Sequence, residues 1–331
     1  MKGKCLKLLS KNNVDIFDYD VPRPGPGQVL IENDYTAISA GTELANIMML
    51  PNTYNTLPGY SGCGRIIELG DGVKNVQLGD RVIDNWGRHM SHNVKNANEL
   101  TMVSDDRISS LEASFVVIAT FPMFGLRRTR LEIGESAMII GQGLLGLFAL
   151  QFAALSGAVP VIVSDLNPKR LELARELGAD YAFSPAEDDY VQKVLDATDG
   201  KGVDCVVEVT GAAIAMRQAL ECTAKFGRLS LLGCTRIPDC TVDFYQLVHK
   251  RGVTIVGTNT TARPRVDSSG GFWTERDEMA AILKLLAHGK FKVKPIISDV
   301  VSPADAHAFY LGLIESKNPN VGYAFDWRQV R

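Results

Sequence analysis

Short apolar runs alternate with segments of helical pattern between residues 137 and 256. Each run has the length of a buried strand, and several end at a glycine or a polar turn. Alternation of this kind predicts a doubly wound sheet of parallel strands. We expect strands at residues 137–140, 159–164, 181–183, 203–209, 228–232 and 253–256, and helices at residues 147–155, 168–177, 186–196, 212–224 and 244–249.

Residues 1–100 have a different pattern, in which strand-like alternation is broken by frequent turn residues. A short helix opens at residues 39–43, where Ser39 or Thr42 is available as a cap. Strands are expected at residues 15–20, 28–33, 62–70 and 77–83, with turn signals at residues 22–27, 58–59 and 71–72. This part of the chain therefore predicts a small β-barrel.

Helical pattern returns from Ser109 to Arg130 and again near the end of the sequence. Ser109 or Ser110 is expected to cap the first of these helices, and Pro122 to begin or kink the next. After a loop at residues 260–271, we expect a helix at residues 275–288 and a strand at residues 295–301. Ser302 then caps a further helix, with Pro303 at its first position.

A glycine pattern follows the first of the parallel strands. Gly141, Gly143 and Gly146 have G-x-G-x-x-G spacing, with Leu144 and Leu145 between the last two. The first glycine permits a tight turn, the second lets the backbone approach a pyrophosphate, and the third lets the helix pack closely on the sheet. The N–H groups at the helix start then face the phosphates. With a strand before it and a helix after it, the pattern predicts a dinucleotide site rather than a chance glycine turn.

Asp165 ends the second parallel strand, 24 residues after Gly141. An acidic side chain here accepts hydrogen bonds from an adenosine ribose and repels a 2′-phosphate, so we expect NAD in preference to NADP. Lys169 and Arg170 weaken this preference, and Arg170 could cover the adenine of either cofactor. By strand-end position, the remaining cofactor path is expected at Thr210, Gly211, Gly233, Cys234 and Thr258.

Composition narrows the classes of partner. The 331 residues are enough for two domains with substantial cores. A net charge of −3, without any Lys/Arg run, argues against a nucleic-acid partner. No segment has the apolar length of a signal peptide or of a membrane helix. We therefore expect a cytoplasmic protein that acts on a small molecule and has no membrane partner.

The six cysteines show no C-x-x-C pair and no spacing typical of a zinc cluster. Cys205 lies in an apolar strand, where we expect it to be part of the core. The reducing compartment inferred above argues against disulfides.

Together, these motifs resemble medium-chain dehydrogenases/reductases, the zinc alcohol dehydrogenase superfamily, over nearly the whole chain. The resemblance rests on residues 22–27, 41–43, 58–59, 79–82 and 304–309, together with the glycine loop and Asp165. It implies an α/β protein with a GroES-like β-barrel catalytic domain, formed by residues 1–117 and 262–331. A doubly wound parallel-sheet (Rossmann) domain would occupy residues 118–261. The resemblance also implies a homodimer or homotetramer, in which residues 253–256 could extend a partner's sheet.

The positions of the family's zinc ligands carry other residues in this sequence. The family has a cysteine before Gly-Thr, a histidine after Pro-Gly and a third ligand that falls near Val117. Here the three residues are Ala40, Tyr60 and Val117, and the four-cysteine lobe expected after residues 79–82 is absent. Zinc needs nitrogen, sulfur or carboxylate donors. We therefore expect no zinc, and residues 39–43 and 58–60 resemble a zinc-free branch, that of bacteriochlorophyllide hydroxyethyl dehydrogenase-type proteins.

Without a metal, a side chain must polarise the substrate oxygen. Tyr60 is the first candidate because it replaces a ligand of the family's active site, although it could instead only fill the zinc void. Thr42 stands where the family relays protons, or it caps a helix. Glu43 is a candidate general base, with a structural role as the favoured interpretation. His89 and His92 are candidate bases or, more simply, surface histidines.

These expectations favour a zinc-independent, NAD-dependent dehydrogenase of a secondary alcohol, such as a polyol, cyclitol or sugar-like substrate. The substrate class follows from the tendency of the family and from polar residues near the expected site. One alternative is an NADPH-dependent quinone or enone reductase, which Asp165 disfavours. Another is a non-catalytic nucleotide-binding protein.

Overall fold

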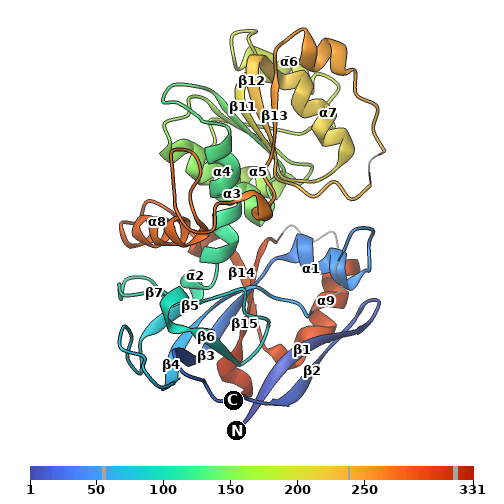
Figure 1. Ribbon diagram of the computed structural model, residues 1–331. Helices are drawn as coiled ribbons and strands as arrows, with labels where there is room; N and C mark the ends of the chain where they lie inside the picture. The colour runs from blue at the N-terminus through green and yellow to red at the C-terminus, as the bar shows by residue number, and fades with distance from the viewer. Residues whose placement is uncertain (54–56, 238, 316–319) are drawn as a thin grey trace. The chain divides into compact units, whose positions relative to one another are not determined.

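The computed structural model describes residues 1–53, 57–237, 239–315 and 320–331. The chain divides into two units, each with its own sheet (Figure 1). Unit 1 consists of residues 1–118 and 279–331, and unit 2 of residues 119–278.

Unit 2 is built on a six-stranded parallel sheet in the order β10-β9-β8-β11-β12-β13. This order confirms the doubly wound sheet that the alternating pattern predicts. The strands are β8 (Ala137–Ile140), β9 (Val161–Ser164), β10 (Tyr181–Phe183), β11 (Val203–Glu208), β12 (Thr223–Leu231) and β13 (Thr254–Gly257). β9 begins two residues later than expected, since Pro160 has no N–H group to donate to a ladder. β12 begins five residues earlier than expected, because Thr223 already pairs with Val203.

A helix precedes β8, and the helices that follow connect the strands at nearly the predicted positions. They are α3 (Val116–Arg128), α4 (Leu144–Leu155), α5 (Pro168–Glu176), α6 (Tyr190–Asp196) and α7 (Ala213–Cys222), followed by a short π-helix at Tyr245–His249. Side chains of α6 and α7 pack on Met138 and Ile140 of β8 and on Val206 of β11. Because side chains alternate along a strand, Ile139 points to the opposite face of the sheet.

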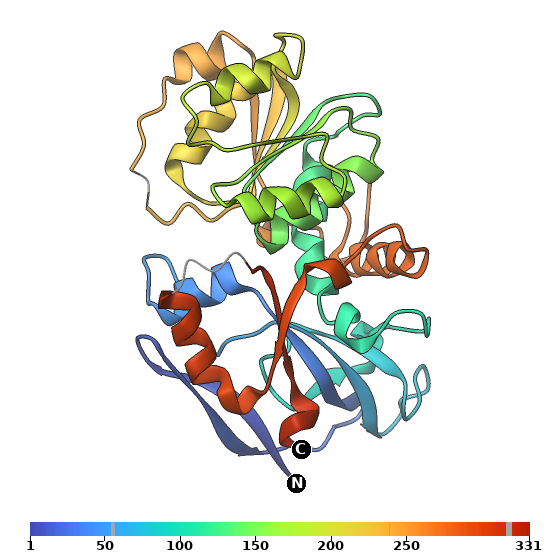
Figure 2. The same cartoon turned by 180° about the vertical axis from the view of Figure 1, so that it is seen from behind.

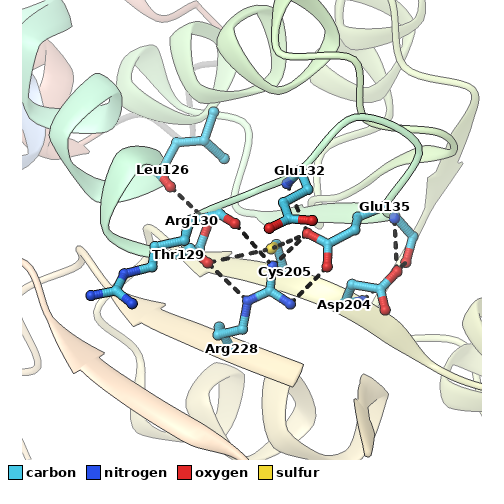
Figure 3. A network of polar contacts seen from close by, with 9 residues as sticks. Leu126, Thr129, Arg130, Glu132, Glu135, Asp204, Cys205 and Arg228 are labelled. Carbon is cyan, nitrogen blue, oxygen red and sulfur yellow. Dashed lines mark hydrogen bonds and ion pairs between the residues drawn. The ribbon is translucent and has the colours of Figure 1, made fainter. Parts of the chain in front are cut away.

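A polar network fastens the amino ends of β8 and β11 to β12 (Figure 3). Arg228 of β12 donates to Glu135 Oε1 at 2.9 Å and to the carbonyl of Thr129 at 2.8 Å. Just before β8, Ser136 donates from its N–H and its hydroxyl to Asp204. The Arg228 guanidinium lowers the pKa of Glu135, chiefly through this hydrogen bond. The burial of Cys205 in the same region raises its thiol pKa to about 12, as expected for a core cysteine.

Unit 1 contains a second, mainly antiparallel sheet in the order β14-β15-β3-β4-β5-β7, with β6 also paired to β3. The long strand β3 (Gln28–Ile38) is central, because β4, β6 and β15 all pair with it. The other strands are β4 (Ser61–Leu69), β5 (Arg81–Asn85), β6 (His92–Asn96), β7 (Thr101–Met102), β14 (Ile297–Val301) and β15 (Gly322–Asp326). A separate hairpin joins β1 (Lys2–Ser10), for which no strand was predicted, to β2 (Asn13–Asp20).

The helices of unit 1 differ from prediction mainly at their ends. α1 (Ala40–Ile47) starts after Ser39, but neither expected cap forms: the Ser39 side chain makes no capping hydrogen bond, and Thr42 lies inside the helix. α2 (Ser110–Ala113) has the predicted cap, since Ser109 and Glu112 form a reciprocal capping box. Pro122 does not begin a helix but lies inside α3. The Ser302 hydroxyl caps a 3-10 turn, Pro303–Asp305, before α9 (Ala306–Glu315), and α8 spans Glu275–Ala287.

α9 packs beside the β1–β2 hairpin on one core of unit 1 (Figure 2). Leu6 and Val14 of the hairpin meet Tyr310 of α9 there, together with Phe325 of β15 and the fully buried Trp327. Segments from both ends of the sequence therefore share this core.

The second boundary between the units lies at 278/279, whereas we expected it near residue 261. The intervening residues are held within unit 2 by Arg263. Its guanidinium donates to the carbonyl of Thr120 at 2.7 Å and to Glu275 at 3.0 Å. Arg127 also stacks on Trp273, with 3.7 Å between the guanidinium carbon and the ring centroid.

β13 is the last strand of its sheet, so the predicted pairing with a partner stays a prediction. Among the described residues, no helix is both long and apolar enough to span a bilayer.

Candidate functional site

The glycine loop joins β8 to α4, and its three glycines are required for three different reasons. Gly141 has φ of +94°, a backbone conformation that side chains rarely tolerate. A Cβ on Gly146 would lie 1.8 Å from the carbonyl oxygen of Gly141, so only glycine lets α4 approach the loop. Apart from its neighbours in the chain, a Cβ on Gly143 would have no atom of the described residues within 4 Å. Protein packing therefore explains Gly141 and Gly146, whereas the open space at Gly143 suits a bound phosphate.

Leu144 and Leu145 form the first turn of α4, with Leu144 almost buried. Gln142, between the first two glycines, is fully buried. Its side-chain amide nitrogen donates to the carbonyl groups of Ile139 and Gly141. These contacts shape the loop from the protein side and leave its outer surface to a ligand.

Asp165 follows β9 directly and supports the glycine loop with its side chain. Its Oδ2 accepts the backbone N–H of Gln142 at 2.7 Å, and its Oδ1 accepts that of Asn167 at 2.8 Å. Arg170 of α5 lies 3.9 Å from Oδ2. Since each carboxylate oxygen can accept two hydrogen bonds, Asp165 retains acceptor capacity for a ribose hydroxyl while it holds the loop.

Glu208, which ends β11, was missed in the sequence. It is fully buried. Burial raises the pKa of its carboxyl group, although the hydrogen bonds from Thr210 and Gly211 lower it in part. Its carboxylate accepts the backbone N–H and the hydroxyl of Thr210, and the N–H of Gly211 at 3.1 Å. Its backbone carbonyl accepts the N–H groups of Leu232 and Gly233. The sequence signal that could have found Glu208 was a single glutamate near the end of a mostly apolar predicted strand.

Glu208 thereby connects the loops that follow β11 and β12, and the loop that follows β8 packs against Thr210. A Cβ on Gly141 would lie 2.5 Å from the Thr210 methyl group, and one on Gly211 would lie 2.5 Å from the carbonyl oxygen of Cys234. A Cβ on Gly233 would lie 2.2 Å from the nitrogen of Gly211. The predicted residues Gly141, Thr210, Gly211, Gly233 and Cys234 therefore meet at one edge of the sheet, where the Cys234 side chain is exposed.

Thr258 is less suited to bind a cofactor than its position at a strand end suggests. It is almost fully buried, and its hydroxyl donates to the carbonyl of Leu231 at 2.8 Å. The Ser230 hydroxyl lies 3.0 Å away. Its side chain thus stabilises the sheet edge.

The three positions at which the family resemblance led us to expect zinc ligands all lie in unit 1. Ala40 is the first residue of α1, Tyr60 precedes β4, and Val117 is fully buried in α3. Alanine and valine have no donor atom, and a phenol is not among the usual zinc ligands. Within the described ranges, no group of three or more His, Cys, Asp or Glu side chains is arranged to hold a metal ion. The side chains at these positions do not fit a zinc ion.

Tyr60 is fixed by the turn that follows β5. Its ring packs on Trp86 with 5.5 Å between centroids, and its carbonyl accepts the Trp86 N–H at 2.9 Å. Trp86 has φ of +55°, which is uncommon for a bulky residue and marks a constrained turn. A Cβ on Gly87 would lie 2.0 Å from the carboxylate of the fully buried Asp84, so this turn requires glycine.

Glu43 and His89 are both buried, with side-chain exposures of 2% and 0%, and they contact each other at 3.1 Å. Glu43 also accepts the Ser39 N–H at 2.9 Å and the Tyr310 hydroxyl at 2.5 Å. The other His89 nitrogen lies 2.7 Å from the Thr36 hydroxyl. Thr42, between Ser39 and Glu43 in the sequence, is partly exposed.

The surface interpretation of His89 and His92 was wrong. His92 is also buried, its Nδ1 lies 2.9 Å from the Ser91 hydroxyl, and burial is the main cause of its lowered pKa. Of the catalytic candidates, Thr42 keeps partial exposure, Tyr60 is largely buried, and Glu43 and His89 bind each other inside the unit.

Two family models match the chain. Residues 25–117 match the alcohol dehydrogenase GroES-like domain, and residues 145–272 match the zinc-binding dehydrogenase domain. L-threonine 3-dehydrogenase of Pyrococcus horikoshii is 31% identical, over 86% of this chain and 87% of that protein. An NAD-dependent alcohol dehydrogenase of Sulfolobus acidocaldarius is 29% identical, over 88% and 90% of the two chains.

The crystal structure of 2R,3R-butanediol dehydrogenase from Bacillus subtilis has the same fold. It matches with a TM-score of 0.82 and 21% identity, over 98% of this chain and 99% of that chain. The GroES-like domain and the parallel-sheet domain expected from the sequence are thus confirmed.

Glu208→Gln should weaken NADH binding about tenfold, because the glutamine amide would face N–H and O–H donors that now bind a carboxylate. Glu135→Gln is the matched control. It also removes a carboxylate that accepts several donors, but at the amino edge of the same sheet. Titration of NADH fluorescence gives the dissociation constants, and thermal unfolding gives the loss of stability. Equal NADH affinity in the two variants would show that Glu208 contributes only to stability.

Proposed function

Because the chain belongs to the zinc-type alcohol dehydrogenase family of medium-chain dehydrogenases/reductases, we propose that it oxidises a secondary alcohol with NAD and without zinc. The coarser activity, an oxidoreductase of the NAD(P)-dependent alcohol dehydrogenase type, follows from family membership. Zinc independence, cofactor preference and substrate class are our proposals.

One observation carries the proposed zinc independence: the residues at the positions that the family resemblance assigns to zinc ligands are Ala40, Tyr60 and Val117. An acid or hydrogen-bond donor must then stabilise the negative charge that develops on the substrate oxygen. Tyr60 offers a phenol at one of these positions, and its ring is held by Trp86. In the proposed reaction, the Tyr60 hydroxyl donates a hydrogen bond to the substrate oxygen. The hydroxyl proton of the alcohol passes to the oxygen of Thr42, and the proton of Thr42 leaves to solvent water, to which this residue is partly exposed.

The cofactor edge of unit 2 fits NAD. Bound there, NAD would supply the chemistry of hydride transfer from the alcohol or to the ketone. The backbone at Gly143 leaves room for the pyrophosphate, and Asp165 offers acceptor capacity to the adenosine ribose. The carboxylate at Asp165 disfavours the 2′-phosphate of NADP.

For the substrate we propose a polyol, cyclitol or sugar-like alcohol. The relatives above act, by their names, on threonine and butanediol, both of which are small and carry a secondary hydroxyl group. An assay with both cofactors over polyols, cyclitols, sugars and amino alcohols tests this class. Turnover of quinones or enones alone, with NADPH, would contradict it.

The purified protein is expected to contain much less than one zinc ion per chain and to keep its activity in a chelator. The reason is the lack of donor atoms at Ala40 and Val117. Metal analysis by mass spectrometry and an assay before and after EDTA treatment check this. Activity that EDTA abolishes and added zinc restores would refute zinc independence.

Tyr60→Phe should lower kcat by about 100-fold, on the order of 2.7 kcal/mol in the barrier, as for the loss of one donor to a developing oxyanion. The NADH dissociation constant should not change. Tyr19→Phe is the control in the same unit, since its hydroxyl donates to the His92 carbonyl instead. Unchanged kcat in Tyr60→Phe would mean that this phenol only fills space.

Asp165→Asn should raise the ratio of kcat/KM for NADP to that for NAD by about 10- to 100-fold, because the charge facing the 2′-phosphate is lost. Asp180→Asn is a matched control at the other end of β9, where Asp180 accepts the Val161 N–H at 2.7 Å. Steady-state kinetics with both cofactors give the ratio. If this ratio is the same in the two variants, Asp165 only stabilises the glycine loop and does not discriminate between the cofactors.

A further inference from the structure

Glu43 and His89 belong to a chain of hydrogen bonds through the core of unit 1. The chain starts at Trp327, whose indole N–H donates to the Thr36 hydroxyl at 2.8 Å. It continues from Thr36 through the imidazole of His89 to the Glu43 carboxylate, which the Tyr310 hydroxyl contacts from α9. All five residues are buried, so neither Glu43 nor His89 is open to a substrate.

The donors and acceptors along this series of hydrogen bonds determine which atom carries each proton. An indole can only donate, so the Thr36 oxygen accepts from Trp327. The Thr36 hydroxyl proton then has one acceptor among its contacts in the described residues, His89 Nδ1. His89 must therefore lack a proton on Nδ1 and carry one on Nε2, from which it donates to Glu43. An imidazolium would leave the buried Thr36 proton without an acceptor.

In this arrangement the Glu43 carboxylate accepts three hydrogen bonds: from the Ser39 N–H, the His89 Nε2–H and the Tyr310 hydroxyl. Burial raises the pKa of Tyr310 well above its usual value, and the Glu43 charge raises it further, so Tyr310 remains a donor. The charge of Glu43 is thus balanced by donors, without a cation.

Two residues of this hydrogen-bonded series, His89 and Glu43, also contact the two segments that carry the proposed catalytic hydroxyls. Gly59, with φ of +91°, packs closely on His89: a Cβ would lie 2.4 Å from the His89 backbone nitrogen and 2.8 Å from Nδ1 of its ring. The backbone N–H of His89 donates to the carbonyl of Pro58 at 2.9 Å, so the ring contact with Gly59 is the one that depends on the side chain. On the other side, Glu43 binds the Ser39 N–H at the start of α1, the helix that contains Thr42.

We propose that His89 and Glu43 are positioning residues: the His89 ring packs on Gly59, Glu43 binds the start of α1, and the hydrogen bond between them holds both segments and so fixes the Tyr60 phenol for the reaction. This inference rests on the proposed function, because Tyr60 is the group that is positioned. It replaces the earlier interpretation in which His89 or Glu43 exchanges a proton with the substrate.

The test compares four variants: Tyr60→Phe, His89→Phe, Tyr310→Phe and the double variant Tyr60→Phe/His89→Phe. His89→Phe keeps a ring against Gly59 and Phe325 but removes both hydrogen bonds, and Tyr310→Phe removes only one donor to Glu43. We expect kcat to fall about tenfold in His89→Phe and about threefold in Tyr310→Phe, with the NADH dissociation constant unchanged. Tyr19→Phe again serves as the control.

Coupling distinguishes positioning from independent roles. If His89 acts through Tyr60, the double variant should lose no more activity than Tyr60→Phe alone. The pH dependence of kcat in His89→Phe should keep its wild-type shape. Nitrogen-15 NMR of labelled histidine at neutral pH, assigned with His89→Phe, should show the neutral Nε2–H tautomer of His89.

Three results would overturn the inference: additive losses in the double variant, loss of one limb of the pH profile in His89→Phe, or an imidazolium at His89. Wild-type kcat in both His89→Phe and Tyr310→Phe would overturn it as well. If Tyr60→Phe itself keeps full activity, it is the proposed function that fails. The tautomer measurement does not depend on activity and also applies if His89→Phe folds poorly.

Discussion

A carboxylate with little access to water must be surrounded by hydrogen-bond donors. Three carboxylates organise the candidate sites of this protein: Glu43 and Glu208 are buried, and Asp165 is partly buried. Asp165 holds the glycine loop through the N–H of Gln142. Glu208 holds the neighbouring loop through Thr210 and Gly211. Glu43 holds the start of α1 and meets His89. In each case the donors belong to a segment that the proposed function requires. The hydrogen bonds that stabilise the carboxylate therefore also fix the position of that segment.

The two edges of the parallel sheet illustrate how the same chemistry serves different ends. At the amino edge, Glu135 is paired with Arg228 and closes a network among β8, β11 and β12 (Figure 3). At the carboxyl edge, Glu208 accepts hydrogen bonds from backbone and hydroxyl donors, and its pKa is raised by burial. An ion pair fastens strands, whereas a carboxylate bound by N–H groups shapes a loop. Ligands of such sheets bind at the carboxyl edge, which is the edge with shaped loops.

The repeating patterns of the sequence were sufficient for the elements and for the glycine loop. Strand β8 and helix α5 fall within a residue of their predicted ends, because a buried strand and a Pro-started helix have strong local signals. Local signals failed where partners are distant. Ser39 looked like a helix cap, but Glu43 satisfies its N–H from within α1. His89 looked like a surface residue because its partners, Thr36 and Glu43, lie on other elements.

The sequence by itself determined the two-part architecture, the dinucleotide loop and the residues that stand at the zinc positions, since each depends on residue type at a short, fixed spacing. Only the tertiary structure decided the roles of Glu208, Glu43 and His89. The Tyr310 donor to Glu43 is 267 residues away along the chain, and Trp327 is 291 residues from Thr36. A hydrogen bond depends on distance in space, so no local pattern records which buried carboxylate receives which donor.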